Sequence, residues 1–416
     1  MTPEGWIQAK YGDIMTETDE RAGGSIELPV LSVTKTRGLM LASERFGKIM
    51  HGRDLSRYRI ARRHAVVADP MLLWDGSIGL QTVTDVGLVS PDYRVYQAAV
   101  GVDPQFLGYV IRSSQMLPHY QGGARGTNVR RNRIARGDFL AIPLSLPPLR
   151  EQKKIAAIIS ALGDSIESSQ AVIDQLQVVK KSMMAELLTR GIPGRHTKFK
   201  MTEIGEVPEE WDVVPLGSLL KVGPDNGIYK AQSEYGEGAP IVRIDGFNNG
   251  DIIRANKFRS VRLSKEETER FKLNSNDILI NRVNSLSHLA KAALVAELSQ
   301  PTVFESNMMR LSVDASCVSP RFVFRVISSP AAKDFFLARA KQAVAQASVN
   351  QQDVCSLPIP LPCDDEQTAV ETLFNCVDQQ YEKELDILAA LRTLKSALVS
   401  ALLSGELRVT PTEATP

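Results

Sequence analysis

The chain has 416 residues, of which 43% are hydrophobic, which is enough for two or more domains with their own cores. The formal net charge of +1 excludes a uniformly basic protein, so any nucleic-acid surface must be local. The four cysteines form no CxxC pair and the five histidines are scattered, so we expect no metal site and a reducing, cytoplasmic compartment. The sequence opens without a basic-then-apolar signal, and we expect no membrane segment because no apolar run approaches about 18 residues.

The first part of the chain predicts short strands between Gly, Asn and Asp turns, with a few short helices. A similar pattern returns after the middle of the chain. We expect strands at Leu28–Val33, Val66–Ala68, Leu72–Trp74, Ala239–Ile244 and Asp277–Ile280, and helices at Phe106–Met116 and Phe322–Ile327. This mixture predicts an α+β fold rather than a doubly wound sheet.

Basic residues gather in two segments of the first part. The first segment contains Arg53, Arg57, Arg59, Arg62 and Arg63. The second is a glycine-rich loop at 122–133 that contains Arg125, Thr127, Asn128, Arg130, Arg131 and Arg133. Arginine can bind phosphates or a guanine edge through two hydrogen bonds, and glycine lets backbone amides approach a phosphate. A solvated loop is the alternative for any single residue, but the combined pattern favours nucleic-acid contact.

A long helix is predicted after the proline-rich segment that begins at Pro143. Apart from Gly163, no glycine or proline interrupts the pattern up to Leu188. Apolar residues alternate at steps of four and three, which is typical of a coiled-coil seam. The seam comprises Ile155, Ile159, Leu162, Ile166, Ile173, Leu176, Met183 and Leu187. Gly191 and Pro193 form the expected stop.

The same pattern recurs 215 residues later. Glu151 and Gln152 correspond to Glu366 and Gln367, and the second seam comprises Val370, Phe374, Val377, Tyr381, Leu388, Leu391, Leu398 and Leu402. Polar residues interrupt both seams at matching positions, at Ser169 and Glu384 and at Lys180 and Lys395. A single stripe of this kind also fits a helix facing a core, but two copies with matching interruptions favour pairing with each other.

The repeat extends into the globular parts, since Pro3 to Trp6 resemble Pro208 to Trp211. The chain is therefore predicted to be a tandem duplication of a globular part and a helix, with globular parts that have diverged further than the helices. The second globular part is rich in amides, which suit adenine through paired hydrogen bonds. Its candidate DNA-binding residues are Asn248, Asn249, Asn281, Arg282, Asn284, Asn350, Gln351 and Gln352.

Catalytic motifs are absent from the sequence. Ile49 follows Gly47 and Lys48 where a phosphate loop requires Ser or Thr, and Gly-x-Ser-x-Gly does not occur. Asp92 with Glu151 and Lys153 superficially suggests a nuclease, but Glu151 stands at a helix start, where a carboxylate complements the helix dipole. We therefore expect no catalytic residues. The competing functional class is an enzyme with its own methyltransferase or nuclease chemistry.

Three motifs resemble those of type I restriction–modification specificity subunits. Pro147 to Ile155 is similar to the proline-leucine-glutamate-glutamine box of that family, and Thr202 to Trp211 is similar to the start of its second recognition domain. Gly87 to Tyr93 resembles a motif found within those domains. The chain departs from the family pattern at Cys363 to Asp365 and at Glu305 to Asn307.

The resemblance implies two target-recognition domains, at 1–148 and 193–362, that each read one half of a split double-stranded DNA target. It also implies two antiparallel spacer helices, at 149–192 and 363–408. The short polar segment at 409–416 is expected to be a disordered tail. Such a subunit is non-catalytic and binds no cofactor. It binds two methyltransferase subunits, which bring S-adenosylmethionine, and through them the restriction/translocase subunits. The alternatives are a coiled-coil scaffold and a specificity protein of a methylation-only system.

Overall fold

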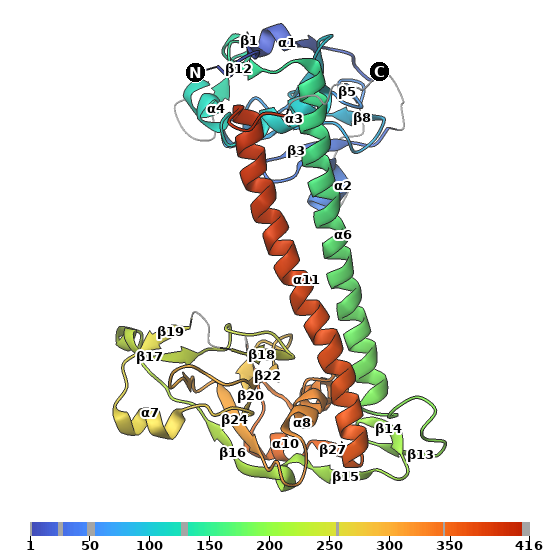
Figure 1. Ribbon diagram of the computed structural model, residues 1–416, viewed down its shortest axis with the longest axis vertical. Coiled ribbons are helices and arrows are strands. Elements are labelled where there is room, and N and C mark those ends of the chain that lie inside the picture. Colours follow the sequence, from blue (N-terminus) through green and yellow to red (C-terminus); the bar gives the residue numbers. More distant parts are fainter. Residues whose placement is uncertain are drawn as a thin grey trace. The chain divides into compact units, whose positions relative to one another are not determined.

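The computed structural model describes residues 2–23, 28–47, 55–125, 132–254, 258–343 and 346–409, which form two compact units. The first unit consists of Met1–Gln170 and Asp386–Pro416, and the second is Ala171–Leu385. The long helices are α6 (Leu149–Leu187) and α11 (Asp364–Ser404), drawn in green and red in Figure 1. Each unit therefore combines one globular part with the adjoining halves of both helices. The domain boundaries expected from the sequence lie instead at the ends of the helices. The tail from residue 410 lies outside the described residues.

The first unit is built around an antiparallel sheet in the order β2-β9-β6-β7. These strands are β2 (Met15–Thr18), β9 (Arg94–Ala98), β6 (Val66–Ala68) and β7 (Ile78–Leu80). Four antiparallel strand pairs surround it: β1 (Ile7–Lys10) with β12 (Pro143–Leu146), β3 (Leu31–Thr34) with β4 (Gly38–Leu41), β5 (Arg59–Arg62) with β8 (Val86–Val89), and β10 (Ala124–Arg125) with β11 (Arg133–Ile134). The helices are α1 (Tyr11–Ile14), α2 (Ala42–Phe46), η1 (Leu73–Asp75), α3 (Pro104–Ile111), α4 (Leu117–Gly123) and α5 (Arg136–Leu140).

Aromatic rings fill the core of the first unit. The hydroxyls of Tyr11 and Tyr120 are 2.9 Å apart, and the ring of Phe139 packs edge-on against Tyr11. Burial raises the pKa of Tyr120, so this hydroxyl stays protonated. Ile155 and Ile159 of α6 belong to the same cluster of buried side chains, which also includes Leu402 and Leu403 of α11. The adjoining helix halves are therefore part of this domain's core.

The second unit contains a five-stranded sheet in the order β16-β24-β20-β22-β18, in which only the β18–β22 pair is parallel. Its strands are β16 (Leu220–Asn226), β24 (Met308–Val313), β20 (Ile278–Asn281), β22 (Ala292–Val295) and β18 (Asp251–Ile253). The smaller sheets are β19-β17-β23, β21-β26-β25, β13-β14 and β15-β27. Their strands are β19 (Arg259–Val261), β17 (Tyr235–Val242), β23 (Val303–Phe304), β21 (Val283–Asn284), β26 (Ala347–Ser348), β25 (Lys341–Gln342), β13 (Phe199–Thr202), β14 (Gly205–Pro208), β15 (Asp212–Pro215) and β27 (Pro358–Leu361).

Short helices complete the second unit. They are η3 (Leu216–Leu219), η4 (Gln232–Glu234), α7 (Lys265–Phe271), α8 (Pro320–Ile327), α9 (Pro330–Arg339) and α10 (Gln351–Cys355). Ser319 and Ser329 accept hydrogen bonds from the first turns of α8 and α9, and each is followed by proline, so both helices start as such sequences predict. Met184 and Leu187 of α6 and Phe374 of α11 complete the core beneath α8.

The predicted α+β class is confirmed, but two local predictions need correction. The strand expected at Leu72–Trp74 is instead a turn that leads into η1. The Asp69 carboxylate accepts a hydrogen bond from the Met71 amide, and Gly76 has φ +88°, so the chain bends before a strand can form. The helix expected to continue to Met116 ends at Ile111.

The internal repeat has a structural counterpart at the start of each long helix. The Trp6 indole donates to Glu151 at 3.1 Å, and Trp211 donates to Glu366 at 3.2 Å. The next residue of each helix also has the same role in both units. Gln152 and Gln367 each donate to the carbonyl five residues earlier. Gln152 also accepts from the amide of Asp103, which caps α3, and Gln367 accepts from the amide of Ser319, which caps α8. The Glu-Gln pair therefore joins a globular part to its helix in both units.

Within each unit the two long helices lie side by side and run in opposite directions. In the second unit, Lys180 pairs with Asp378 at 2.8 Å and Gln177 donates to Tyr381 at 2.9 Å. In the first, Arg392 donates to Gln170 at 3.3 Å. All sixteen residues predicted to form the seam are buried or half-buried. Their role as a continuous coiled-coil seam stays a prediction.

Among the helices of the described ranges, α11 alone is long and apolar enough to cross a membrane, judged by length and composition. Core helices of water-soluble proteins pass the same test, and Phe374 and Leu402 of α11 are buried in the two cores.

Candidate nucleic-acid interface

The basic loop of the first unit stands on a short hairpin formed by β10 and β11. The hairpin places Arg125 directly opposite Arg133. Like charges in this position repel each other, so the base of the loop attracts an anion. The Asp138 carboxylate lies 3.7 Å from the Arg125 guanidinium, and the Arg125 side chain remains 83% exposed. The other predicted residues of this loop lie outside the described residues: Thr127, Asn128, Arg130 and Arg131.

The other basic segment of this unit, which contains Arg57, Arg59 and Arg62, is largely neutralised by its own chain. Arg62 donates to both carboxylate oxygens of Glu20, at 3.1 and 2.6 Å. Arg59 is only 14% exposed and lies 3.2 Å from Asp19, near Glu17. Arg57 is exposed, whereas Arg53 lies outside the described part of the chain. The stretch that looked most basic in the sequence therefore presents less positive charge than its composition predicts.

The second unit has a hairpin at the corresponding place in its fold. The order α9-β25-β26-α10-β27-α11 repeats the order α4-β10-β11-α5-β12-α6 of the first unit. Arg133 of β11 lies fourteen residues before Pro147, and Ser348 of β26 lies fourteen residues before the equivalent Pro362. Lys341 and Gln342 on β25 are both exposed. Sequence reasoning missed these two residues, although the spacing to the helix box would have located their hairpin through Ser348, which pairs with Lys341.

The second unit's hairpin is extended by β21, and this brings two predicted segments together. Asn284 pairs with Ala347 across the β21–β26 ladder, and the Val349 amide donates to the Arg282 carbonyl. The segments around Asn284 and Asn350, which are far apart in the chain, therefore lie side by side. Together with Lys341 they form a polar surface on one small sheet.

Several predicted amides already bond to their own chain. The Asn350 side chain accepts from Asp353 N at 2.9 Å and caps α10, and Gln351 donates to the Pro224 carbonyl at 2.6 Å. Asn249 bridges α8 and β22, donating to Ser328 O at 2.7 Å and accepting from Ala292 N at 2.9 Å. Asn248 and Gln352 are exposed.

Buried polar groups lie behind these surfaces. Asp69 follows β6, and burial raises the pKa of its carboxyl above the usual value although two backbone amides donate to it. Asn281 ends β20 and is completely buried, with no hydrogen-bond partner for either side-chain polar atom among the described residues. The Lys291 ammonium donates to the carbonyls of Ile244 and Phe247, and burial lowers its pKa.

Within the described ranges no three His, Cys, Asp or Glu side chains are grouped closely enough to hold a metal ion. The four cysteines are free thiols. The carboxylate Glu151, which superficially suggested nuclease chemistry, bonds to Trp6 and to the Arg408 guanidinium. Burial alone would raise the pKa of Glu151, but these hydrogen bonds outweigh it and lower the pKa. This carboxylate therefore has a structural role in the first unit.

Residues 74–178 and 208–391 match the family described as the type I restriction modification DNA specificity domain. The MjaVIII type I restriction enzyme specificity subunit of Methanocaldococcus jannaschii is 27% identical, over 82% of this chain and 79% of its own. The EcoKI specificity subunit of Escherichia coli (strain K12) is 26% identical, over 77% of this chain and 68% of its own.

Two solved structures share the fold. One is a chain from a type I R-M system studied for complex assembly and conformational transition, with a TM-score of 0.58, 17% identity and coverage of 98% of this chain and 100% of that chain. The other is the type I restriction–modification S subunit from M. genitalium, with a TM-score of 0.55, 11% identity and coverage of 99% and 100%. Because the family match spans more than half of the sequence, this chain belongs to the type I restriction–modification DNA specificity family.

Proposed function

We propose that this chain reads a bipartite DNA target, with each globular part binding one half. The observation that carries this proposal is the duplicated interface: both units present a polar hairpin, and in both a short helix and one strand separate this hairpin from the long helix. The residues on the two hairpins differ, with Arg125 and Arg133 in one and Lys341 and Gln342 in the other. Different side chains on one shared scaffold support two different half-sites.

In this mechanism, phosphate contacts fix the register and side chains on the loops read base edges. Arg125 and Arg133 suit phosphates or the acceptor pair of guanine, whereas Asn284 and Gln342 suit adenine. Arg53 and Arg57 are candidates for additional contacts in the first half. The remaining candidates are Thr127, Asn128, Arg130 and Arg131 in the first half, and Asn248, Arg282 and Gln352 in the second.

We further propose that the chain is non-catalytic and recruits two methyltransferase subunits. These would bring S-adenosylmethionine, and restriction/translocase subunits would join through them. The repeated long helices support this assignment, because their matching sequences offer two equivalent binding surfaces to two copies of one partner. The length of the helices would then set the unread gap between the half-sites.

Co-expression with the genomically neighbouring methyltransferase subunit, in a host that lacks adenine methylation, tests this proposal. Methylome sequencing should reveal two short specified halves around a fixed unspecified gap. A continuous motif would contradict the two-reader mechanism. Restriction of unmethylated phage DNA by the complete complex distinguishes a restriction system from a methylation-only system.

A coiled-coil scaffold without a DNA role is the second candidate, and the paired long helices favour it. It predicts that a variant with Arg125→Ala and Arg133→Ala leaves every interaction of the complex unchanged. The DNA-recognition proposal predicts weaker DNA binding by this variant, with intact assembly of the methyltransferase complex.

A further inference from the structure

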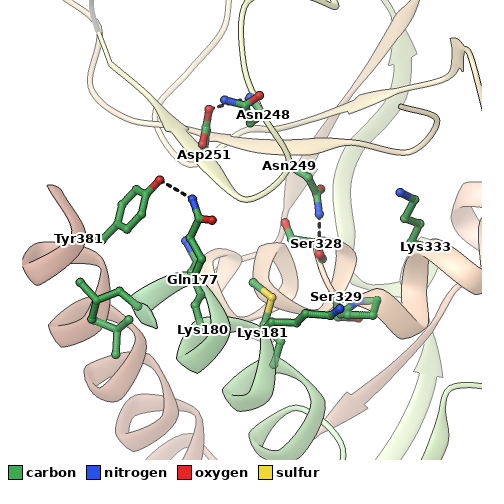
Figure 2. A pocket seen from close by; sticks show the side chains of 14 residues that line it. Gln177, Lys180, Lys181, Asn248, Asn249, Asp251, Ser328, Ser329, Lys333 and Tyr381 are labelled. Atoms are coloured by element: carbon green, nitrogen blue, oxygen red, sulfur yellow. Dashed lines mark hydrogen bonds between the residues drawn. The ribbon is translucent and has the colours of Figure 1, made fainter. Parts of the chain in front are cut away.

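The second unit contains a cavity of about 490 Å³ beside its long helices. Gln177 and Tyr381 approach it from α6 and α11, whereas Asn249, Ser328 and Lys333 approach it from the globular part (Figure 2). The cavity is large enough for a phosphate group with an attached sugar. Of the DNA-binding candidates named above, Asn248 also lines the cavity, but no role has yet been assigned to its lysines or to Ser328.

The lining of the cavity carries an excess of positive charge. It includes three lysines, Lys180, Lys181 and Lys333, and one carboxylate, Asp251. Lys181 is exposed, and the Lys333 ammonium donates to the neutral carbonyl of Ser287 at 3.0 Å. Neither of these two lysines has a carboxylate partner among the described residues. An anionic ligand would therefore meet two uncompensated ammonium groups.

Lys180 adds to this charge although it is paired. Its partner Asp378, 2.8 Å away, also binds the buried Arg325 guanidinium. One carboxylate is therefore shared by two cations, and the group of three keeps a net positive charge. The potential at the cavity wall is positive even where a salt bridge is present.

A buried hydroxyl provides an independent sign of a ligand. Ser328 is only 2% exposed, and its Oγ has no hydrogen-bond partner among the residues that the structure describes. Buried hydroxyls are normally hydrogen-bonded, so an unpartnered one in a cavity wall calls for a ligand atom. Ser328 is the C-cap of α8 and precedes Ser329, the N-cap of the ten-residue helix α9, whose N-terminal end favours negative charge.

We propose that this cavity binds a phosphate group of the DNA backbone, through Lys181, Lys333 and the Ser328 hydroxyl. This inference rests on the proposed function, because it assumes that the unit binds DNA. The cavity adjoins the candidate reading surface: Lys333 holds the loop that follows β21, and α9 leads directly into β25. A phosphate bound here would fix the register of the duplex while the residues on β21 and β25 read bases.

The test uses the complex of this chain with its methyltransferase subunits. Binding to the target duplex and to a scrambled duplex is measured at several salt concentrations, for the wild type and for the double variant Lys181→Gln/Lys333→Gln. We expect both affinities to fall by a similar factor of about ten, and the salt slope to fall by about one to two, because phosphate contacts carry no sequence information. The methylated motif should stay unchanged. Lys265→Gln, on the exposed surface of α7 in the same unit, is the matched control and should change nothing.

Ser328→Ala provides a second readout. A hydroxyl that lacks a protein partner contributes no hydrogen bond to folding, so the melting temperature should not fall while the affinity for both duplexes decreases several-fold. A lower melting temperature with unchanged DNA affinity would show a purely structural hydroxyl and would overturn its role as a ligand.

The outcomes separate this inference from the function on which it rests. If the double variant binds DNA as the wild type does while the Arg125→Ala/Arg133→Ala variant is weakened, the phosphate site is wrong and DNA recognition stands. If the complex binds no DNA at all, the proposed function itself fails. Loss of methyltransferase binding with unchanged DNA affinity would identify an acidic protein partner instead. Saturable binding of inorganic phosphate without competition from DNA would identify a small-ligand site, and either result overturns the inference.

Discussion

At the scale of single residues, one buried carboxylate organises each unit. Glu366 is 1% exposed and accepts hydrogen bonds from Trp211, His196 and the Ile192 amide. Glu151 bonds to Trp6, Arg408 and the Val409 amide in the first unit. In both units, the segment that follows one long helix is held at the start of the other. A buried charge with several donors of this kind is costly to disturb, because removing it leaves its partners unsatisfied.

Stability should depend on pH through His196. Burial would lower the pKa of His196, but its hydrogen bonds to Glu366 and Glu210 outweigh this and raise the pKa above 6.5. Burial would likewise raise the pKa of Glu366, and the hydrogen bonds from His196 and the Ile192 amide lower it below 4.5. The His196 interactions stabilise the folded state fully below the histidine's unfolded pKa. This stabilisation is lost as pH rises through the raised pKa of the folded state. The Glu366 interactions stabilise the folded state above about pH 4.5, the glutamate's unfolded pKa. This stabilisation is lost as pH falls through the lowered pKa of the folded state.

The stabilisation of the wild type over His196→Gln should therefore be largest between pH 4.5 and 6.5 and should shrink toward pH 8.5. We expect a difference of about 1 kcal/mol in unfolding free energy at its maximum, because a neutral glutamine amide lacks the attraction of the imidazolium charge to the Glu366 and Glu210 carboxylates. Thermal melts of both proteins across this range measure it. A difference that does not change with pH would contradict a charged His196–Glu366 pair.

Gly191 makes the close approach around Glu366 possible. It has φ +75°, and a Cβ atom at this position would lie 2.8 Å from the Glu366 carboxylate and 2.9 Å from the Trp211 ring. Gly191→Ala should therefore destabilise the second unit by about 2–4 kcal/mol, from backbone strain and steric overlap. Gly194 has φ +81° with nothing near its Cβ position, so Gly194→Ala is the matched control and should cost only about 1 kcal/mol. Equal losses in denaturant unfolding would argue against the steric contribution.

At the scale of elements, the polar interruptions of the two helical seams differ in their surroundings. Lys180 of α6 faces Asp378 of α11, which also binds Arg325 of α8. The equivalent lysine of α11 is Lys395, and it faces Gly163, which is the repeat counterpart of Asp378. Both helices therefore carry the lysine, but only α11 carries a carboxylate at the facing position. A glycine within a helix also costs conformational entropy.

Gly163→Ala should stabilise the first unit by about 0.5–1 kcal/mol, because alanine is the better helix former. Only the flexible end of Lys395 lies near the position of the new methyl group. Gly163→Asp should give a similar gain that decreases at high salt, since it would recreate the pair formed by Lys180 and Asp378. Denaturant unfolding at low and high salt measures both variants. A loss of stability in both would show that the helices require glycine here for close packing.

In contrast, Asp378→Asn should destabilise the second unit. The substitution leaves the buried Arg325 guanidinium and Lys180 without a counter-charge, and the expected cost is about 3–5 kcal/mol. Pairing it with Arg325→Met in a double-mutant cycle tests the cause. Simple additivity of the two effects would contradict a direct interaction between these side chains.

At the scale of the whole molecule, the duplication predicts independent readers. Replacing residues 193–362 with the corresponding segment of another family member should change one half of the methylated motif and leave the other half unchanged. The long helices and their Glu-Gln boxes stay in place in this exchange, so complex formation should persist. Methylome sequencing of the exchanged protein provides the measurement, and the reciprocal exchange of residues 1–148 is its control. A change in both halves would contradict independent recognition.

Much of the organisation follows from the sequence alone. The duplication, the two long helices and the residues of their apolar stripes are visible there, because helix periodicity is a local property and a buried face repeats at a fixed interval. The α+β class likewise follows from local turn and strand patterns. The Leu72–Trp74 strand was wrong for a local reason as well, since the Asp69 side chain competes for the backbone amide that a strand would use.

Only the tertiary structure decided which polar residues remain available. Arg59 and Arg62 form a basic cluster in the sequence, but folding places them against Asp19 and Glu20, which lie about forty residues earlier in the chain. Asn350 caps a helix, whereas Lys341 and Gln342 become exposed on the equivalent hairpin. Charge neutralisation and exposure depend on neighbours that are distant in the chain. The repeat and the helices were therefore evident from the sequence, but the candidate DNA-binding surface required the fold.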